Sequence, residues 1–285
     1  MKDRKIQWHP GFVSAMNLEL IKYKEYLEFE KEYNLNTKPL EIDLLVIKKD
    51  AGVEIGNEIG KLFRGHNIME YKSPGDHLDI DVFYKAGAYA GLYKSYGSKV
   101  DERKAEDITV SLVREGKPEG LFAYFQEHGY GLSNEYRGIY YVEGNVLFPT
   151  QIIVTKELEE KEHVWLRALS ENVEEKDARM LLEQMKGIKE KGELELAEAV
   201  LEVMMEANER LVEGWKGDEN MLETLMEIME PQLQQREESG RKEGRKEAIQ
   251  GTVGALRKFN HKDAEIKVII MDEFGLTEQE AVEYF

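Results

Sequence analysis

Alternating apolar and polar residues predict a sheet in the first half of the chain. Strand-like patterns cover residues 26–33, 40–48, 67–72, 107–113, 137–142 and 149–154. Residues two apart on a strand share one face, so this alternation is typical of strands with one buried side. The turn-forming residues 34–39 separate the first two patterns and predict that these strands form a hairpin.

Helical spacing of apolar residues interrupts the strand patterns. It occurs in residues 11–24, around 57–63, at 118–127, and in a segment that ends near Lys94. Asp79 or Asp81 is the predicted N-cap of that last segment, because aspartate accepts hydrogen bonds from free N–H groups at a helix start. The order of helix, strands, helix and strands predicts an α/β or α+β domain over residues 1–155.

The pattern changes to helix alone after residue 155. Residues 156–230 keep helical spacing with almost no strand signal. Pro231 is predicted to end the last of these helices, because proline lacks an N–H group and clashes with the preceding turn.

Residues 231–285 predict a polar linker helix followed by a small helical unit. The tetrapeptide Gly-Arg-Lys-Glu occurs twice in residues 240–247, with acids alternating with bases as on a solvated helix. Thr277 and Glu280 have the spacing of a capping box before the last helix. We expect a mostly helical C-terminal extension that serves packing or homo-oligomerisation.

The negative charge of the chain is concentrated in its middle. The 285 residues carry a formal charge of −18, of which residues 157–230 contribute −13 and residues 1–156 only −3. Non-specific DNA binding depends on Lys and Arg neutralising phosphates, so the total charge argues against it. The nearly neutral first part remains compatible with a site that engages a few phosphates through a metal.

The composition limits the cellular compartments and the kinds of catalytic or metal site that are compatible with the chain. The chain has no cysteine, which excludes disulfides, thiolate zinc sites and cysteine nucleophiles and fits a reducing compartment. Its apolar runs are too short to span a bilayer, and its first ten residues show no signal peptide. We therefore expect a cytoplasmic protein with no membrane partner. Histidine pairs with metal-ligand spacing, a phosphate-binding glycine loop and a serine-hydrolase elbow are all missing from the sequence.

Two neighbouring predicted strands carry acids and a lysine in an arrangement that could bind a metal ion and a phosphate. Asp43 lies within the apolar strand pattern of residues 40–48, and Glu70 and Lys72 share one face at the end of the next strand. Carboxylate oxygens are ligands that Mg²⁺ prefers, and a nearby lysine can orient water or stabilise a phosphate transition state. By spacing alone, the same residues are equally compatible with the solvent-facing side of a sheet.

The sequence around these residues resembles a nuclease superfamily. The resemblance covers roughly residues 10–155 and is carried by residues 35–49, 58–74, 81–85 and 89–94. These runs are similar to the PD-(D/E)XK nucleases, and more narrowly to their recombination-promoting nuclease and transposase (Rpn-like) branch. Two departures are that Ile42 replaces the proline of the motif, and that Tyr84 and Tyr89 stand where some relatives have a glutamine.

The resemblance implies a fold, an activity and a set of site residues. It implies a restriction-endonuclease-like core of order α-β-β-β-α-β, the order read independently from the patterns. It implies Asp43 and Glu70 as Mg²⁺ ligands, Lys72 as the catalytic lysine and Glu19 as a further metal ligand on the first helix. The implied activity is Mg²⁺-dependent cleavage of double-stranded DNA, in the context of recombination or a mobile element.

Two other functions remain open from the sequence. One is a catalytically inactive interaction protein that keeps the nuclease fold, which the acidic helical segment and the few basic residues favour. The other is a metal-dependent hydrolase of RNA or nucleotides. Residues Asp76, Asp79 and Asp81 offer a second metal site, although turn and capping roles suit them better, and Arg64 and Lys85 are candidate phosphate contacts.

Overall fold

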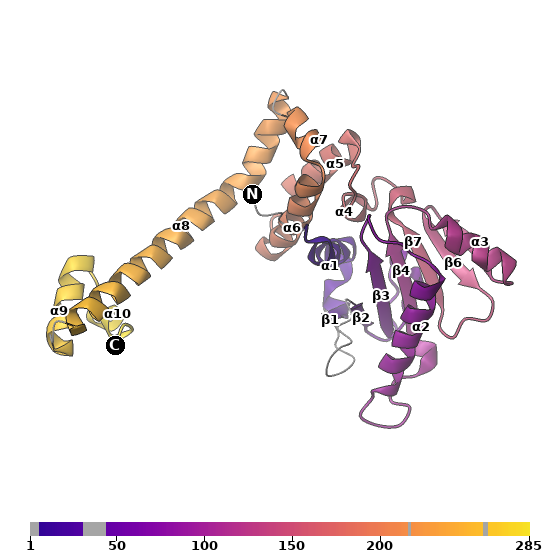
Figure 1. Cartoon of the computed structure of the whole chain (residues 1–285), viewed down its shortest axis with the longest axis horizontal. Helices are drawn as coiled ribbons and strands as arrows, with labels where there is room; N and C mark the ends of the chain where they lie inside the picture. The colour runs from indigo at the N-terminus through magenta and orange to yellow at the C-terminus, as the bar shows by residue number, and fades with distance from the viewer. Residues whose placement is uncertain (1–5, 31–43, 216–217, 259–261) are drawn as a thin grey trace. The chain divides into compact units, whose positions relative to one another are not determined.

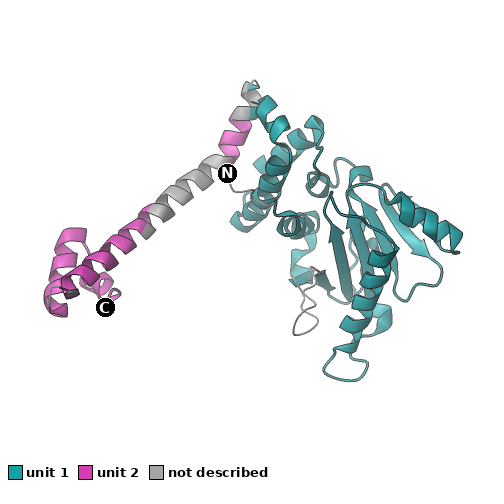
Figure 2. Ribbon diagram, viewed as in Figure 1, with its two compact units in different colours: residues 1–222 teal, residues 223–285 magenta. Residues whose placement is uncertain are grey.

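A computed structural model of the protein describes residues 6–30, 44–215, 218–258 and 262–285. Within these ranges the chain divides into two compact units, residues 1–222 and residues 223–285 (Figure 2). The first unit combines one mixed sheet with helices, so the predicted α+β class is confirmed. None of the described helices is both long enough and apolar enough to cross a membrane.

The sheet of the first unit has seven described strands in the order β1-β2-β3-β4-β7-β6-β5 (Figure 1). β3 and β4 are parallel, as are β4 and β7, whereas the other neighbouring pairs are antiparallel. The strands are β1 (Leu27–Glu30), β2 (Leu44–Lys49), β3 (His66–Lys72), β4 (Ile108–Arg114), β5 (Gly131–Tyr136), β6 (Ile139–Glu143) and β7 (Thr150–Val154).

Most predicted elements are found within a few residues of their expected bounds, and one strand was missed. β5 is the edge strand of the sheet, and its sequence Gly-Leu-Ser-Asn-Glu-Tyr shows no apolar alternation. Its residues are half-buried or exposed, and its pairing with β6 shifts register after Ser133. An edge strand needs less apolar surface than a central one, which explains why the pattern failed to mark it.

A buried amide fixes β3 between its neighbours. Asn67 is fully buried, and its Nδ2 donates to the carbonyl of Ile47 on β2 at 3.0 Å. Its Oδ1 accepts a hydrogen bond from Thr109 Oγ1 on β4 at 2.7 Å. Because a buried polar group is costly when unpaired, these contacts favour a single register across three strands.

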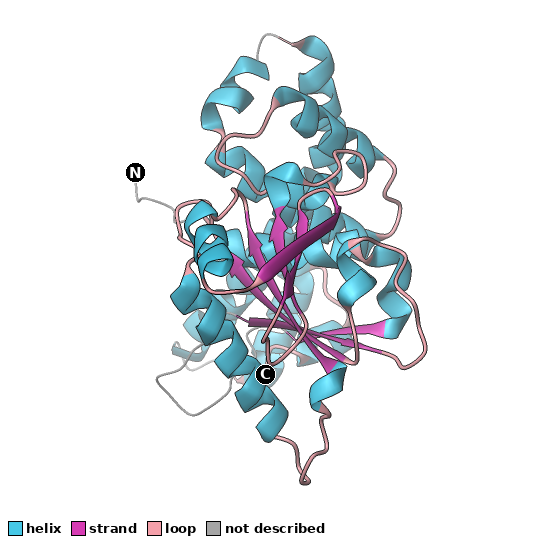
Figure 3. Ribbon diagram, turned by 90° about the vertical axis from the view of Figure 1, so that its right-hand side faces the viewer, coloured by secondary structure: helices cyan, strands magenta, loops and turns pink. Residues whose placement is uncertain are grey.

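Helices flank the strands on both sides (Figure 3). One face is covered by α2 and α3, whose Ala86, Tyr93 and Phe125 pack on Ile68 and Leu112 of the sheet. The helices of the first unit are α1 (Trp8–Glu19), α2 (Ile80–Ser95), α3 (Glu119–Glu127), α4 (Val164–Arg167), α5 (Glu175–Lys186), α6 (Lys191–Ala207) and α7 (Glu209–Gly214).

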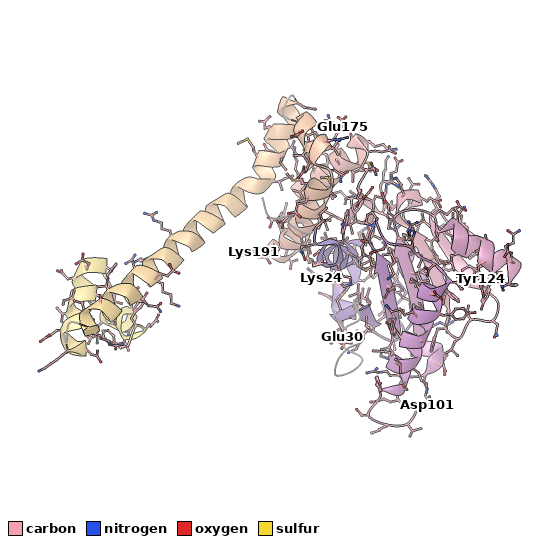
Figure 4. The ribbon with its side chains drawn as sticks, in the orientation of Figure 1. Lys24, Glu30, Asp101, Tyr124, Glu175 and Lys191 are labelled. Carbon is pink, nitrogen blue, oxygen red and sulfur yellow. The ribbon has the colours of Figure 1, made fainter. Side chains whose placement is uncertain are left out.

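The opposite face of the sheet is covered by α1. Phe12 of α1 stacks on Tyr71 of β3, with ring centroids 4.5 Å apart. Helices α4 and α6 contact α1 in turn, and a side chain at Gly11 would begin 2.8 Å from Val203 on α6. Lys24, labelled in Figure 4, forms salt bridges with two glutamates at the start of α6. Helices α4 and α6 therefore form a second layer on α1.

The second unit has its own small apolar core. The unit consists of α8 (Glu219–Lys258) from Glu223 onward, with α9 (Asp263–Phe274) and α10 (Glu278–Val282). The predicted capping box is confirmed, since Glu280 N donates to Thr277 Oγ1 at 3.3 Å and Thr277 N donates to Glu280 Oε2 at 2.8 Å. The buried core residues are Ile249, Val253, Ile266, Ile270 and Ala281.

The predicted helix end at Pro231 is wrong. α8 is continuous over 40 residues and passes through Pro231. A proline inside a helix removes one backbone hydrogen bond and clashes with the preceding turn, at a cost of about 3 kcal/mol. The helix nevertheless continues on both sides of the proline, so this local cost does not decide where α8 ends.

Gly138 is required by close backbone packing in the turn between β5 and β6. Its φ is +72°, and a Cβ there would lie 2.7 Å from both the backbone N of Leu158 and the backbone O of Val154. Its carbonyl accepts a hydrogen bond from Val154 N at 2.7 Å, which ties the turn to the end of β7.

We expect Gly138→Ala to lower the free energy of unfolding by about 1–3 kcal/mol, because alanine meets both a strained φ and backbone atoms that cannot move cheaply. Urea denaturation measures the change. Gly120→Ala on α3 is the matched control, since a Cβ there meets no atom within 4 Å. The control should gain about 0.4–1 kcal/mol. Equal stability of the two variants would contradict this account of the turn.

Candidate active site at the carboxyl edge of the parallel strands

The carboxyl ends of β3, β4 and β7 meet at one edge of the sheet. The parallel register places Lys72 opposite Arg114, and Arg114 opposite Val154. In open α/β sheets, ligands commonly bind outside the carboxyl ends of such strands. This edge is therefore where the strands best present functional side chains.

Glu70 and Lys72 lie together at this edge. Lys72 Nζ is 2.8 Å from Glu70 Oε1, and the two side chains are only 19% and 8% exposed. Strand alternation puts both on the face of Ile68 and Leu112, which α2 covers. The salt bridge is only partly solvated, so the attraction between its groups is stronger than that of an exposed surface pair.

Asp43, the third predicted site residue, lies outside the described residues. The described part of β2 begins at Leu44, which pairs with Glu70 across the strands. Of the predicted set, the structure therefore brings Glu70 and Lys72 together.

Glu19 is placed in a different set of contacts from the one that the sequence predicted. It ends α1, on the face of the sheet opposite Glu70, and its side chain is fully buried. Its Oε2 lies 2.9 Å from Nδ1 of His163, and its Oε1 accepts a hydrogen bond from Leu166 N at 3.3 Å. Both oxygens thus bind the segment around α4.

His163 bridges two carboxylates inside the protein. Its ring is 1% exposed, with Nδ1 facing Glu19 and Nε2 lying 3.3 Å from Oε2 of Glu58. Burial alone would lower the pKa of His163, but the hydrogen bonds and charges of Glu19 and Glu58 outweigh it and raise the pKa above its usual 6.5. A positive charge on this ring satisfies two acids at once and joins three segments of the first unit.

The described residues do not form a metal site by themselves. No group of three or more His, Asp or Glu side chains able to hold a metal ion is found among them. Glu70 offers one carboxylate, and Mg²⁺ commonly uses one or two protein carboxylates, with water and substrate phosphates as its other ligands. The chemistry of Glu70 fits the predicted ion, and Asp43 is the second carboxylate that the sequence predicts.

Arg114 adds a second cation beside Lys72 that the sequence patterns did not single out. Its Nε donates to the carbonyl of Asp76 at 3.1 Å, and its Nη1 donates to the carbonyl of Gly116 at 3.0 Å. These bonds to the turns after β3 and β4 hold the guanidinium at the edge. In the sequence, Lys72 and Arg114 each lie at the end of a strand pattern. Only the parallel pairing of β3 and β4 shows that these two cations lie side by side.

Tyr71 lies between the two site residues in sequence but points to the other face. It is 7% exposed, and its hydroxyl has no hydrogen-bond partner among the described residues. Burial, reinforced by the acids Glu115, Asp76 and Glu171, raises the pKa of Tyr71 above its usual value. The phenol therefore stays protonated at neutral pH.

The remaining candidates serve the local structure. Ser73 Oγ donates to Asp76 Oδ2 at 2.6 Å in the turn after β3, and Asp79 Oδ1 accepts from Val82 N at 3.0 Å as the N-cap of α2. These contacts match the predicted turn and capping roles. Lys85 lies over the ring of Tyr89, and Arg64 donates to the carbonyl of Glu106 before β4.

Comparisons of the chain with protein-family models, with curated proteins and with solved structures found no match.

His163 gives the first unit a specific pH dependence. Because its pKa is raised on folding, the charged ring stabilises the fold fully below about pH 6.5, and this contribution is lost as the pH rises through the folded-state pKa. We expect His163→Gln to lower the free energy of unfolding by about 1–3 kcal/mol at pH 6 and by less above pH 8.

Urea denaturation of the full chain across this pH range measures the difference between the two proteins. His77→Gln is the control, since His77 is exposed in the turn before α2. A loss in His163→Gln that stays constant or grows with pH would contradict the assignment of a charged, paired histidine.

Proposed function

We propose that the protein is a Mg²⁺-dependent endonuclease that hydrolyses phosphodiester bonds of double-stranded DNA. The observation that carries the proposal is the contact of Glu70 with Lys72, at 2.8 Å on one face of β3, at the edge where three parallel strands end. Lysine and carboxylate together are the groups that metal-assisted phosphodiester hydrolysis uses.

The order of elements supports the same proposal. Within the described residues the chain runs α1, β1, β2, β3, α2 and β4, which is the α-β-β-β-α-β order that the sequence resemblance implies. β1, β2 and β3 are antiparallel, and α2 crosses back so that β4 is parallel to β3. The lysine and glutamate of the resemblance fall on β3, next to this crossover.

Each residue of the proposed site would have a separate role in the reaction. A Mg²⁺ ion held by Glu70 and Asp43 would activate water and neutralise charge on the phosphate. Lys72, oriented by Glu70, faces the same side and can hold the attacking water or stabilise the negative charge that develops on the phosphate. Arg114, fixed next to Lys72 in the register, can bind a neighbouring phosphate of the backbone.

A second candidate is an inactive protein that keeps this fold as an interaction module. It is favoured by the described residues, which contain no group of three or more side chains able to hold a metal ion, and by the formal charge of −18. Here the Glu70–Lys72 contact would serve only as a partly buried salt bridge.

Plasmid cleavage decides between these candidates. We expect the wild-type protein to nick or linearise supercoiled DNA with Mg²⁺, and to lose this activity when EDTA is added. Glu70→Gln, Lys72→Met and Asp43→Asn should each reduce the rate at least about 100-fold, because each removes a group that acts in the transition state.

Glu127→Gln and Lys99→Met, both at exposed positions, are the matched controls and should retain wild-type rates. Wild-type protein that leaves DNA intact, or Glu70→Gln that cleaves at the wild-type rate, would overturn the proposal. Cleavage of RNA with DNA left intact would instead support a hydrolase acting on RNA.

A further inference from the structure

A cavity of about 300 Å³ lies away from the Glu70 site, between α2 and the loop that joins β6 to β7. α2 contributes Phe83, Tyr84, Gly87 and Gly91 to its wall, and the β6–β7 loop contributes Leu147. The strands below it, β4 and β7 (Figure 1), line it near their starts, whereas Glu70 and Lys72 are at the end of β3 in the sequence.

Two glycines keep the cavity open. Gly87 and Gly91 are one helical turn apart on α2, so both face the same side. A Cβ built on either meets no atom within 4 Å, which means that open space lies where their side chains would begin. Glycine inside a helix costs about 1 kcal/mol relative to alanine. α2 has two such glycines, Gly87 and Gly91, and both lie on the side that lines the cavity.

Aromatic rings form much of the wall. Phe83 meets the ring of Tyr130 edge-on, with centroids 5.9 Å apart and an interplanar angle of 78°. It meets Tyr84 in the same way at 5.5 Å and 72°. The nearby Tyr84 hydroxyl, together with burial, raises the pKa of Tyr130. Aromatic rings favour such edge-to-face contacts, and a further ring can extend the cluster.

The mouth of the cavity carries apolar surface that solvent reaches. Leu147 is 75% exposed and Tyr84 is 54% exposed, so both present apolar surface to solvent. Covering them with a bound molecule would remove apolar area from water, at a gain of roughly 25 cal/mol per Å².

The lack of charged side chains in the wall indicates which class of ligand the cavity can bind. No Asp, Glu, Lys, Arg or His is among the residues that line the cavity, although such charged residues make up a third of the chain. An ion would lose its hydration there without gaining a partner, so the wall favours a neutral molecule. A volume of about 300 Å³ is at the small end of ligand pockets.

We propose that this cavity binds a small, neutral, aromatic molecule of one or two fused rings. Such a molecule matches the aromatic wall, the lack of charge and the size of the space. The tyrosine hydroxyls and Asn145 at the rim supply hydrogen bonds for one polar group on the ring. This site is independent of the proposed nuclease activity, since it lies apart from Glu70 and Lys72.

Indole is a suitable probe, because it is neutral, bicyclic and carries one N–H donor. Titration of the full-length protein, followed by saturation-transfer NMR, should show saturable binding of indole. Gly91→Leu should weaken the binding at least tenfold, because the leucine side chain would fill the open space. Leu147→Asp should weaken it as well, by placing a charge at the mouth.

Gly120→Leu is the matched control, since Gly120 is also a helical glycine with open space at its Cβ but lies outside the cavity on α3. It should bind indole like the wild type. Leu147 is an exposed loop residue, so Leu147→Asp tests the site even if Gly91→Leu fails to fold. Absence of saturable indole binding to the wild type, or unchanged binding in the folded cavity variants, would overturn the proposal.

Discussion

The position of β3, between an antiparallel and a parallel neighbour, is the constraint on which the rest of the structure depends. Asn67 makes this position specific, because its buried amide bonds to Ile47 on β2 and to Thr109 on β4. A strand that is parallel to its neighbour needs a crossover connection, and α2 supplies it. The crossover brings the ends of β3 and β4 to one edge, where Glu70, Lys72 and Arg114 lie.

The sheet separates two kinds of buried charge. On the face covered by α2, Glu70 and Lys72 form a pair at the edge that is only partly buried. On the face covered by α1, Glu19 and His163 form a fully buried pair that holds α1 to the start of α4. Breaking a buried pair leaves an uncompensated charge, so this contact constrains how the helical layer docks. The first pair is the one on which the proposed function rests, and the second joins elements of the fold.

The sequence was a good guide wherever the physics is local. Strand alternation around β3 and the cap at Asp79 depend on neighbouring residues, and both were predicted. The contact between Glu19 and His163 joins residues 144 positions apart, so no local pattern marks it, and Glu19 was expected at the metal instead. Arg114 was missed for a related reason, since its proximity to Lys72 depends on strand pairing. The cavity could not be predicted from the sequence. Gly87 and Gly91 line it only because α2 packs against the β6–β7 loop, and that packing has no local sequence pattern.

The central claim is that Glu70 belongs to a divalent-metal site at the carboxyl edge of the sheet. The most direct measurement is calorimetric titration of the purified protein with Mg²⁺, with Glu70→Gln and Glu127→Gln measured in parallel. The account predicts saturable binding to the wild type and to Glu127→Gln, and binding at least tenfold weaker to Glu70→Gln. Equal affinity in Glu70→Gln and the wild type, or no saturable Mg²⁺ binding to the wild type, would contradict it.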